Sequence, residues 1–259
     1  MPKQRLDQLL VDRGLASSRA AAQALILAGE VEMPSAGTRN LKPGLQVAPD
    51  VELVLRERPR WASRAGAKLE AALDEFGVDP SGLACLDAGA STGGFTDVLL
   101  ARGARVVYAV DVGRGQLVDR LRSDERVRSM ERVNLRSLES LPELVELSTL
   151  DLSFISLALV LPSVRRLMHP RGRAIALVKP QFEAGRGAVP RGGVVTDPAV
   201  HRDVLDRFRA DAERAGFGAT ALIRSPLTGS EGNVEFLALI GPLPGLDRAA
   251  WDELVAAAT

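Results

Sequence analysis

Residues 83–97 read LACLDAGASTGGFTD, and this stretch decides the fold expected for the chain. The apolar run at its start is typical of a buried strand, and the glycines that follow predict a tight loop that opens a helix. Strand and helix patterns then alternate towards the end of the chain, which is typical of a parallel α/β sheet with helices on both faces. Ligands of such sheets bind where the strands end, so we expect a binding site at this loop.

The same loop indicates what kind of ligand binds. Gly89, Gly93 and Gly94 lack the spacing of the G-x-G-x-x-G dinucleotide motif. Asp87 at the strand end would repel a pyrophosphate but attract an amino group or a sulfonium, and Asp111 after the second strand can hydrogen-bond a ribose diol. An amino acid, a sulfonium and one ribose together describe S-adenosylmethionine. A structural turn with capping acids and a dinucleotide site remain as alternative interpretations.

The N-terminal segment has a different pattern. Two short amphipathic helices, the second opened by Ser17 and Ser18 and ended by Gly29, are followed by two short extended pieces. We therefore predict three parts: a small α+β domain over residues 1–55, a linker over 56–62, and a Rossmann-like α/β domain over 63–259.

Charge is divided unevenly between these parts. The chain holds 33 basic and 33 acidic residues, but its first 68 residues hold 11 basic and seven acidic ones. An anionic partner should therefore bind the N-terminal end. Of the basic residues only four are lysines: Lys3, Lys42, Lys68 and Lys179. Because burial can neutralise lysine but not arginine, each lysine is a candidate functional residue.

Four charged residues fall at positions that suggest chemistry. Lys179 is expected at the end of the fifth strand, Asp151 at the end of the fourth, Glu235 within the last strand, and Lys68 on the first helix of the α/β domain. Taken singly, Lys68 fits a solvated helix face, Asp151 a helix cap and Glu235 an edge-strand charge. Lys179 is harder to explain in this way, because a lysine at a strand end faces the expected ligand cleft.

Seven motifs together resemble a known family. They are SRAGAKL (63–69), LDAGASTGGFTD (86–97), YAVDVGRGQL (108–117), DLSFISL (151–157), LVKPQFE (177–183), GVVTDP (193–198) and SPLTGSEGNVEF (225–236). They are similar to the TlyA, or haemolysin-A-like, ribosomal RNA 2′-O-methyltransferases, which have an FtsJ-type catalytic domain. Residues 5–31 resemble the αL RNA-binding module first described in a small-subunit ribosomal protein. One departure lies at residues 31–44, VEMPSAGTRNLKPG, where the family usually has a V-x-V-x-G turn.

The resemblance implies a function and a set of site residues. It implies methyl transfer from S-adenosylmethionine to the ribose 2′-hydroxyl of a cytidine in ribosomal RNA. It also implies a catalytic Lys-Asp-Lys-Glu tetrad, which maps onto Lys68, Asp151, Lys179 and Glu235. The expected cofactor contacts are Asp87, Gly89, Ala90, Ser91, Thr92, Gly93, Gly94, Phe95, Asp111, Val112, Asn134 and Asp151.

For the reaction, we expect Lys179 to assist removal of the 2′-hydroxyl proton, with Asp151 and Glu235 orienting Lys179 and Lys68. Lysine's ordinary pKa of about 10.4 makes it a poor base at neutral pH unless its surroundings change it. Stabilisation of the developing alkoxide by a cationic Lys179 is the alternative. RNA contacts are expected from Arg5, Arg19, Lys42, Arg60 and Arg64, with Phe154 stacking on a base.

Several other classes of protein are disfavoured. A single cysteine argues against disulfides, and the isolated His169 and His201, expected at the surface, leave no evident metal site. The sequence shows neither a signal peptide nor a run of about 20 apolar residues, so we expect a cytoplasmic, monomeric protein without a membrane partner. A non-catalytic RNA- or ribosome-binding factor remains the main alternative function, whereas a pore-forming haemolysin would need an apolar segment.

Overall fold

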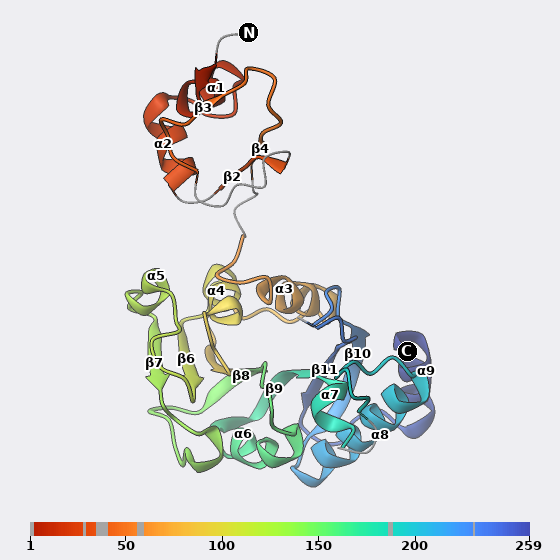
Figure 1. Ribbon diagram of the computed structural model, residues 1–259. Helices are drawn as coiled ribbons and strands as arrows, with labels where there is room; N and C mark the ends of the chain where they lie inside the picture. The colour runs from red at the N-terminus through yellow and green to blue at the C-terminus, as the bar shows by residue number, and fades with distance from the viewer. Residues whose placement is uncertain (1–2, 28–29, 35–40, 56–59, 186–188, 230) are drawn as a thin grey trace. The chain divides into compact units, whose positions relative to one another are not determined.

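The computed structural model describes residues 3–27, 30–34, 41–55, 60–185, 189–229 and 231–259 (Figure 1). The chain divides into two compact units, Met1–Arg60 and Trp61–Thr259.

The N-terminal unit is built on two short helices, α1 (Leu6–Asp12) and α2 (Arg19–Leu27). Four two-residue strands pair antiparallel, β1 (Gln4–Arg5) with β3 (Gln46–Val47) and β2 (Val31–Glu32) with β4 (Val54–Leu55). Apolar residues three and four apart on α1 supply much of the core, because they share one face of the helix. The buried set is Leu6, Leu9, Leu10, Ala22, Ile26, Val31, Met33 and Val47. The prediction of a small α+β domain is confirmed.

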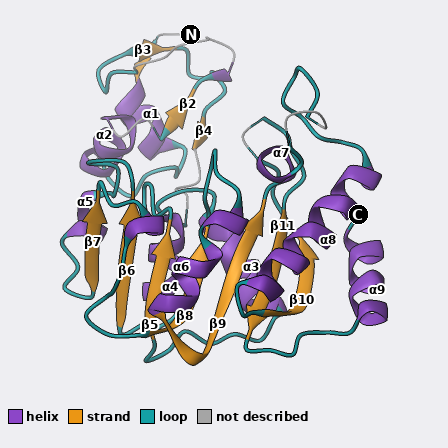
Figure 2. Cartoon of the chain, turned by 90° about the horizontal axis from the view of Figure 1, so that it is seen from below, coloured by secondary structure: helices purple, strands orange, loops and turns teal. Residues whose placement is uncertain are grey.

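The second unit contains a seven-stranded sheet in the order β10-β11-β9-β8-β5-β6-β7 (Figure 2). The strands are β5 (Ala84–Ala88), β6 (Val106–Asp111), β7 (Val127–Glu131), β8 (Val145–Leu150), β9 (Met168–Val178), β10 (Gly218–Arg224) and β11 (Phe236–Gly241). The five strands β5 to β9 run parallel, whereas β11 pairs antiparallel with both β9 and β10. The sheet is therefore mixed rather than wholly parallel.

Helices cover both faces of this sheet, as predicted (Figure 1). On one face α3 (Gly66–Glu75), α4 (Gly94–Ala101) and α5 (Asp119–Arg122) pack over one apolar cluster. On the other face α6 (Leu161–Leu167), α8 (Pro198–Arg214) and α9 (Arg248–Ala258) pack over a second cluster. Three short elements, the 3-10 helices η2 (Leu135–Ser137) and η3 (Leu157–Leu159) and helix α7 (Pro180–Glu183), lie in the connections.

The start of the second unit differs from the predicted boundary. Trp61 is 8% exposed and belongs to an apolar core of the second unit, where it leaves no room for a side chain at Gly66. The backbone N–H of Ala62 donates to the Asp97 carboxylate on α4 at 2.8 Å. These two residues, which we assigned to the linker, are therefore part of the folded unit, and linker residues 56–59 lie outside the described residues.

Strand order places the site. From β5 the chain proceeds to β6 and β7 on one side, and later to β8 and β9 on the other side. A crevice forms at the carboxyl ends of the strands where the order reverses in this way. The loops after β5 and β8 therefore meet at one edge of the sheet.

Candidate active site

A cavity of about 460 Å³ lies at this edge. Its walls come from the loop after β5, the loop after β8, the start of α3, helix α7 and the segment before β11. Seven of the predicted cofactor contacts line it: Gly89, Ala90, Ser91, Thr92, Gly94, Phe95 and Asp151. All four residues of the predicted tetrad also line it, as do Arg64 and Phe154.

The loop after β5 depends on glycine. Gly89 has a φ of +85°, and a Cβ atom there would collide with the backbone carbonyl oxygen of Asp151. The absence of a side chain lets the two loops touch, which explains why the stretch needs glycine at this position. This contact places Asp151 next to the loop.

Asp111, the last residue of β6, is held by two backbone amides. Its Oδ2 atom accepts from the N–H of Ser91 at 2.8 Å, and its Oδ1 atom accepts from the N–H of Gly113 at 2.6 Å. Asp111 lines a small hollow with Ser91 and Gly113. Its carboxylate is therefore fixed beside the glycine-rich loop, in a position suited to bind a hydroxyl-bearing group.

Asp87 does not line either of these hollows, contrary to our expectation. Its side chain is fully buried and accepts hydrogen bonds from Thr96 Oγ1 at 2.6 Å and Thr149 Oγ1 at 3.2 Å. Strand alternation is the reason: Asp87 still lies inside β5 and points to the same face as Cys85, beneath α4. Burial raises the pKa of Asp87 to about 7, against the lowering effect of the Thr96 hydrogen bond.

We predict that Asp87 makes stability depend on pH. The folded-state pKa of Asp87 lies above the unfolded value of about 3.9, so ionisation of its carboxyl group destabilises the folded protein. This destabilisation is absent below pH 4, grows between pH 4 and pH 7, and is complete above pH 7. Asp87→Asn removes this titration. Urea unfolding at pH 5, 6, 7 and 8 gives the free energy of unfolding of the variant and of the wild type. The variant's value minus the wild-type value should increase by about 1 kcal/mol per pH unit up to pH 7 and then level off. A constant difference would contradict the assignment.

Three further predicted cofactor contacts are not among the residues that line the two hollows in the described structure. Val112 is 71% exposed beside Asp111. Asn134 is exposed and caps η2, its side chain accepting from the N–H of Arg136 at 3.0 Å. Gly93 packs against Leu117 and Leu121 with a φ of +97° and so shapes the loop from behind.

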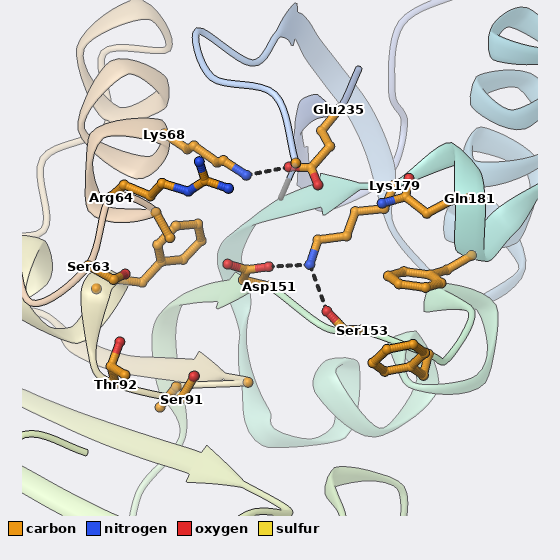
Figure 3. Close-up of a pocket in the computed structure, with 18 of the residues that line it drawn as sticks. Ser63, Arg64, Lys68, Ser91, Thr92, Asp151, Ser153, Lys179, Gln181 and Glu235 are labelled. Atoms are coloured by element: carbon orange, nitrogen blue, oxygen red, sulfur yellow. Dashed lines mark hydrogen bonds and ion pairs between the residues drawn. The ribbon is translucent and has the colours of Figure 1, made fainter. Parts of the chain in front are cut away.

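The predicted tetrad forms two separate ion pairs in one cavity (Figure 3). Lys179, between β9 and α7, donates to Asp151 Oδ1 at 2.6 Å, and these side chains are 10% and 19% exposed. Lys68 on α3 contacts Glu235, and these side chains are 8% and 3% exposed. Asp151 therefore orients Lys179 and Glu235 orients Lys68, so the two carboxylates serve different lysines.

Glu235 lies one residue before β11 rather than inside it. Its backbone carbonyl accepts from the N–H of Ser225 at 2.8 Å. Gly229 lies so close to the Glu235 carboxylate that a side chain at Gly229 would have to displace it. The absence of a side chain at Gly229 therefore leaves room for this carboxylate next to Lys68.

Two aromatic side chains form the rim near Lys179. Phe154 is 91% exposed and has a φ of +63°, a backbone conformation that few residues other than glycine adopt. Its ring centroid lies 5.0 Å from that of Phe182 on α7. A large apolar ring held exposed at a cavity mouth is unusual and suits contact with a partner.

The predicted RNA contacts of the N-terminal unit are two arginines that share one carboxylate and two further exposed basic residues. Arg5 and Arg19 both contact Asp7, at 2.8 and 3.1 Å, and their side chains are still 41% and 53% exposed. The hydrogen bond from Arg5 holds the pKa of the buried Asp7 well below its usual range. Lys42 and Arg60 are exposed, and residues 35–40 of the altered turn lie outside the described residues.

Sequence reasoning missed several residues that organise the site. Ser153 accepts a hydrogen bond from Lys179, and Glu183 accepts from Ser156 Oγ and from the N–H of Leu157, tying the loop after β8 to α7. Their place inside the DLSFISL and LVKPQFE motifs was the available signal. His201 was wrongly expected at the surface: it is 3% exposed and contacts the carbonyl oxygen of Val195.

Comparison with known proteins assigns both units. Residues 61–241 match the FtsJ-like methyltransferase family, and residues 4–32 match the S4 domain. The 16S/23S rRNA (cytidine-2′-O)-methyltransferase TlyA of Mycobacterium tuberculosis is 47% identical over 90% of this chain and 87% of its own length. Hemolysin A of Brachyspira hyodysenteriae is 38% identical over 90% of this chain and 98% of its own length.

A solved structure agrees with this assignment. A protein from Streptococcus thermophilus that is named as a hemolysin superposes with a TM-score of 0.75 at 43% identity, over 99% of this chain and 96% of its own. Within the described part of this chain, no helix is both long and apolar enough to cross a membrane. The chain therefore belongs to the FtsJ-like methyltransferase family, in the S4-containing group that includes the TlyA rRNA methyltransferases.

Proposed function

We propose that this protein methylates a ribose 2′-hydroxyl of ribosomal RNA, at a cytidine, with S-adenosylmethionine as the methyl donor. The observation that carries the proposal is the pair of lysine–carboxylate contacts that face one cavity beside a glycine-rich loop. The FtsJ-like domain, the S4 domain and the TlyA relatives support it.

The described residues fit this cofactor. The Gly89–Thr92 loop and Asp111 would hold it, because the Asp111 carboxylate is fixed at the end of β6, where it can accept hydrogen bonds from a ribose diol. S-adenosylmethionine, when bound, supplies an electrophilic sulfonium methyl group. Asp87 lies beneath α4, so it holds the start of that helix through Thr96 rather than meeting the ligand.

The lysines have separate tasks in this proposal. Lys179 meets the 2′-oxygen and takes part in the loss of its proton, and Asp151 fixes the direction of the Lys179 amine. Lys68 and Glu235 form a more deeply buried pair beside Lys179 in the same cavity, and this pair keeps the charged groups in place. Alignment of the reacting atoms then supplies a large part of the rate.

RNA would be captured in two steps. Arg5, Arg19, Lys42 and Arg60 of the N-terminal unit and Arg64 of the second unit bind phosphates, which position the substrate without reading its sequence. The target base, turned out of its stack, then packs on the exposed ring of Phe154. Since ribosomal RNA is the proposed substrate, we infer that the protein works in the cytoplasm on ribosomal particles, and we further propose that it acts as a monomer.

The test is methyl transfer from labelled S-adenosylmethionine to ribosomal RNA by the purified protein, followed by mapping of ribose methylation. One 2′-O-methylated cytidine, present in RNA from cells that carry the gene and absent in cells that lack it, is the expected result. Asp151→Asn serves as the inactive control. Binding of RNA without transfer of label would instead identify a non-catalytic RNA-binding factor.

A further inference from the structure

Ser153 is the second group that contacts the Lys179 amine. It lies two residues after Asp151 in the loop after β8 and lines the same cavity. Its Oγ atom accepts from Lys179 Nζ at 3.0 Å, while Asp151 Oδ1 accepts from the same nitrogen at 2.6 Å (Figure 3). The amine is therefore held from two sides rather than one.

Two contacts restrict the amine much more than one. A lysine ammonium has three donors arranged around one nitrogen on a flexible stem. With one donor on Asp151 and another on Ser153, a single tetrahedral direction is left, and Lys179 borders the cavity. A neutral amine held by the same two bonds would aim its lone pair in that direction.

The loop that carries Ser153 is itself fixed relative to Lys179. Glu183 accepts from Ser156 Oγ at 2.7 Å and from the N–H of Leu157 at 2.8 Å. Glu183 ends the short helix α7, and Lys179 immediately precedes that helix. Ser153 and Lys179 are thus carried by two segments that are bonded to each other, so their spacing is set before any substrate binds.

We propose that Ser153 is a positioning residue for the methyl-transfer step, and that its hydroxyl fixes the one free direction of the Lys179 amine towards the substrate oxygen. This inference rests on the proposed function. Without the hydroxyl, Lys179 keeps its ion pair with Asp151, but its amine can turn about that contact. Misplacement of a reacting group by about 1 Å can lower a rate by about 100-fold.

The kinetic test compares Ser153→Ala with Ser153→Thr, which keeps a hydroxyl. Ser153→Ala should lower the single-turnover rate at saturating RNA and cofactor by about 10- to 100-fold, with both dissociation constants within about two-fold of the wild type. Ser153→Thr should restore most of the rate. Ser163→Ala is the matched control, because the Ser163 hydroxyl donates to the carbonyl oxygen of Arg136 away from the cavity. An unchanged rate in Ser153→Ala, or a loss confined to affinity, would overturn the proposal.

A second measurement does not depend on RNA. The chain has only four lysines, so a protein labelled with ¹³C-lysine gives four Cε signals, each assignable by a Lys→Arg variant. Ser153→Ala should move the Lys179 signal and raise its mobility while the Lys68 signal stays in place, and Ser153→Thr should reverse the change. An unmoved Lys179 signal would refute the contact itself. If the wild type transferred no methyl group, the proposed function would fail, while this spectrum would still decide whether Ser153 holds the Lys179 amine.

Discussion

Lys179→Arg is expected to lower the single-turnover rate of methyl transfer by about 100- to 10,000-fold, the range associated with removal of a group that handles a proton. Arginine keeps the positive charge beside Asp151 but cannot lose its proton at any practical pH. Its planar guanidinium is also longer, so it cannot reproduce the contacts that Asp151 and Ser153 make with a single nitrogen. Rapid-quench measurement with labelled S-adenosylmethionine provides the rate.

Lys179→Met separates the two possible roles of this side chain. If Lys179 takes the proton, Lys179→Arg and Lys179→Met should be slowed to a similar extent. If Lys179 acts only as a cation that stabilises the alkoxide, the arginine variant should be clearly faster than the methionine variant. A near-normal rate in Lys179→Arg would sink the base assignment. Cofactor affinity and thermal unfolding of each variant show whether the cavity is otherwise intact.

Sequence patterns predicted the fold, whereas the family resemblance predicted which charged residues form the site. The structure explains one contact of this site: β8 and β9 are parallel neighbours that end at one edge of the sheet, so Asp151 and Lys179 meet there. The contact between Lys68 and Glu235 joins residues 167 positions apart. No local spacing relates them, so only the family resemblance suggested that they belong together.

The errors have physical causes as well. Asp87 looked like a strand-end carboxylate, but β5 runs one residue further, and alternation turns Asp87 under α4 towards Thr96. Sequence patterns locate an element more reliably than its last residue, and one residue decides which face a side chain occupies. Ser153 was missed for a different reason: its contact with Lys179 depends on how the loop after β8 is tied to α7, and a hydrogen bond between two loops leaves no periodic signal.

Glu235→Ala is expected to lower the free energy of unfolding by about 3–5 kcal/mol, since it leaves the Lys68 charge buried without its partner. The side chains of this pair are only 8% and 3% exposed, so water can do little to replace the lost carboxylate. Urea unfolding at constant pH gives the value. The matched control is Arg248→Ala, which removes the ion pairs of a 61% exposed side chain with Asp206 and Asp252 and should cost no more than about 1 kcal/mol.

Replacing both partners at once distinguishes stability from catalysis. Lys68→Met with Glu235→Leu removes both buried charges and fills their volume, so it should recover most of the stability that Glu235→Ala loses. Methyl transfer should nevertheless stay at least 100-fold below the wild type, because the charged pair beside Lys179 in the cavity is gone. A double variant that regained both stability and rate would show that the pair only supports the fold, whereas one that regained stability alone would assign Lys68 and Glu235 to the reaction.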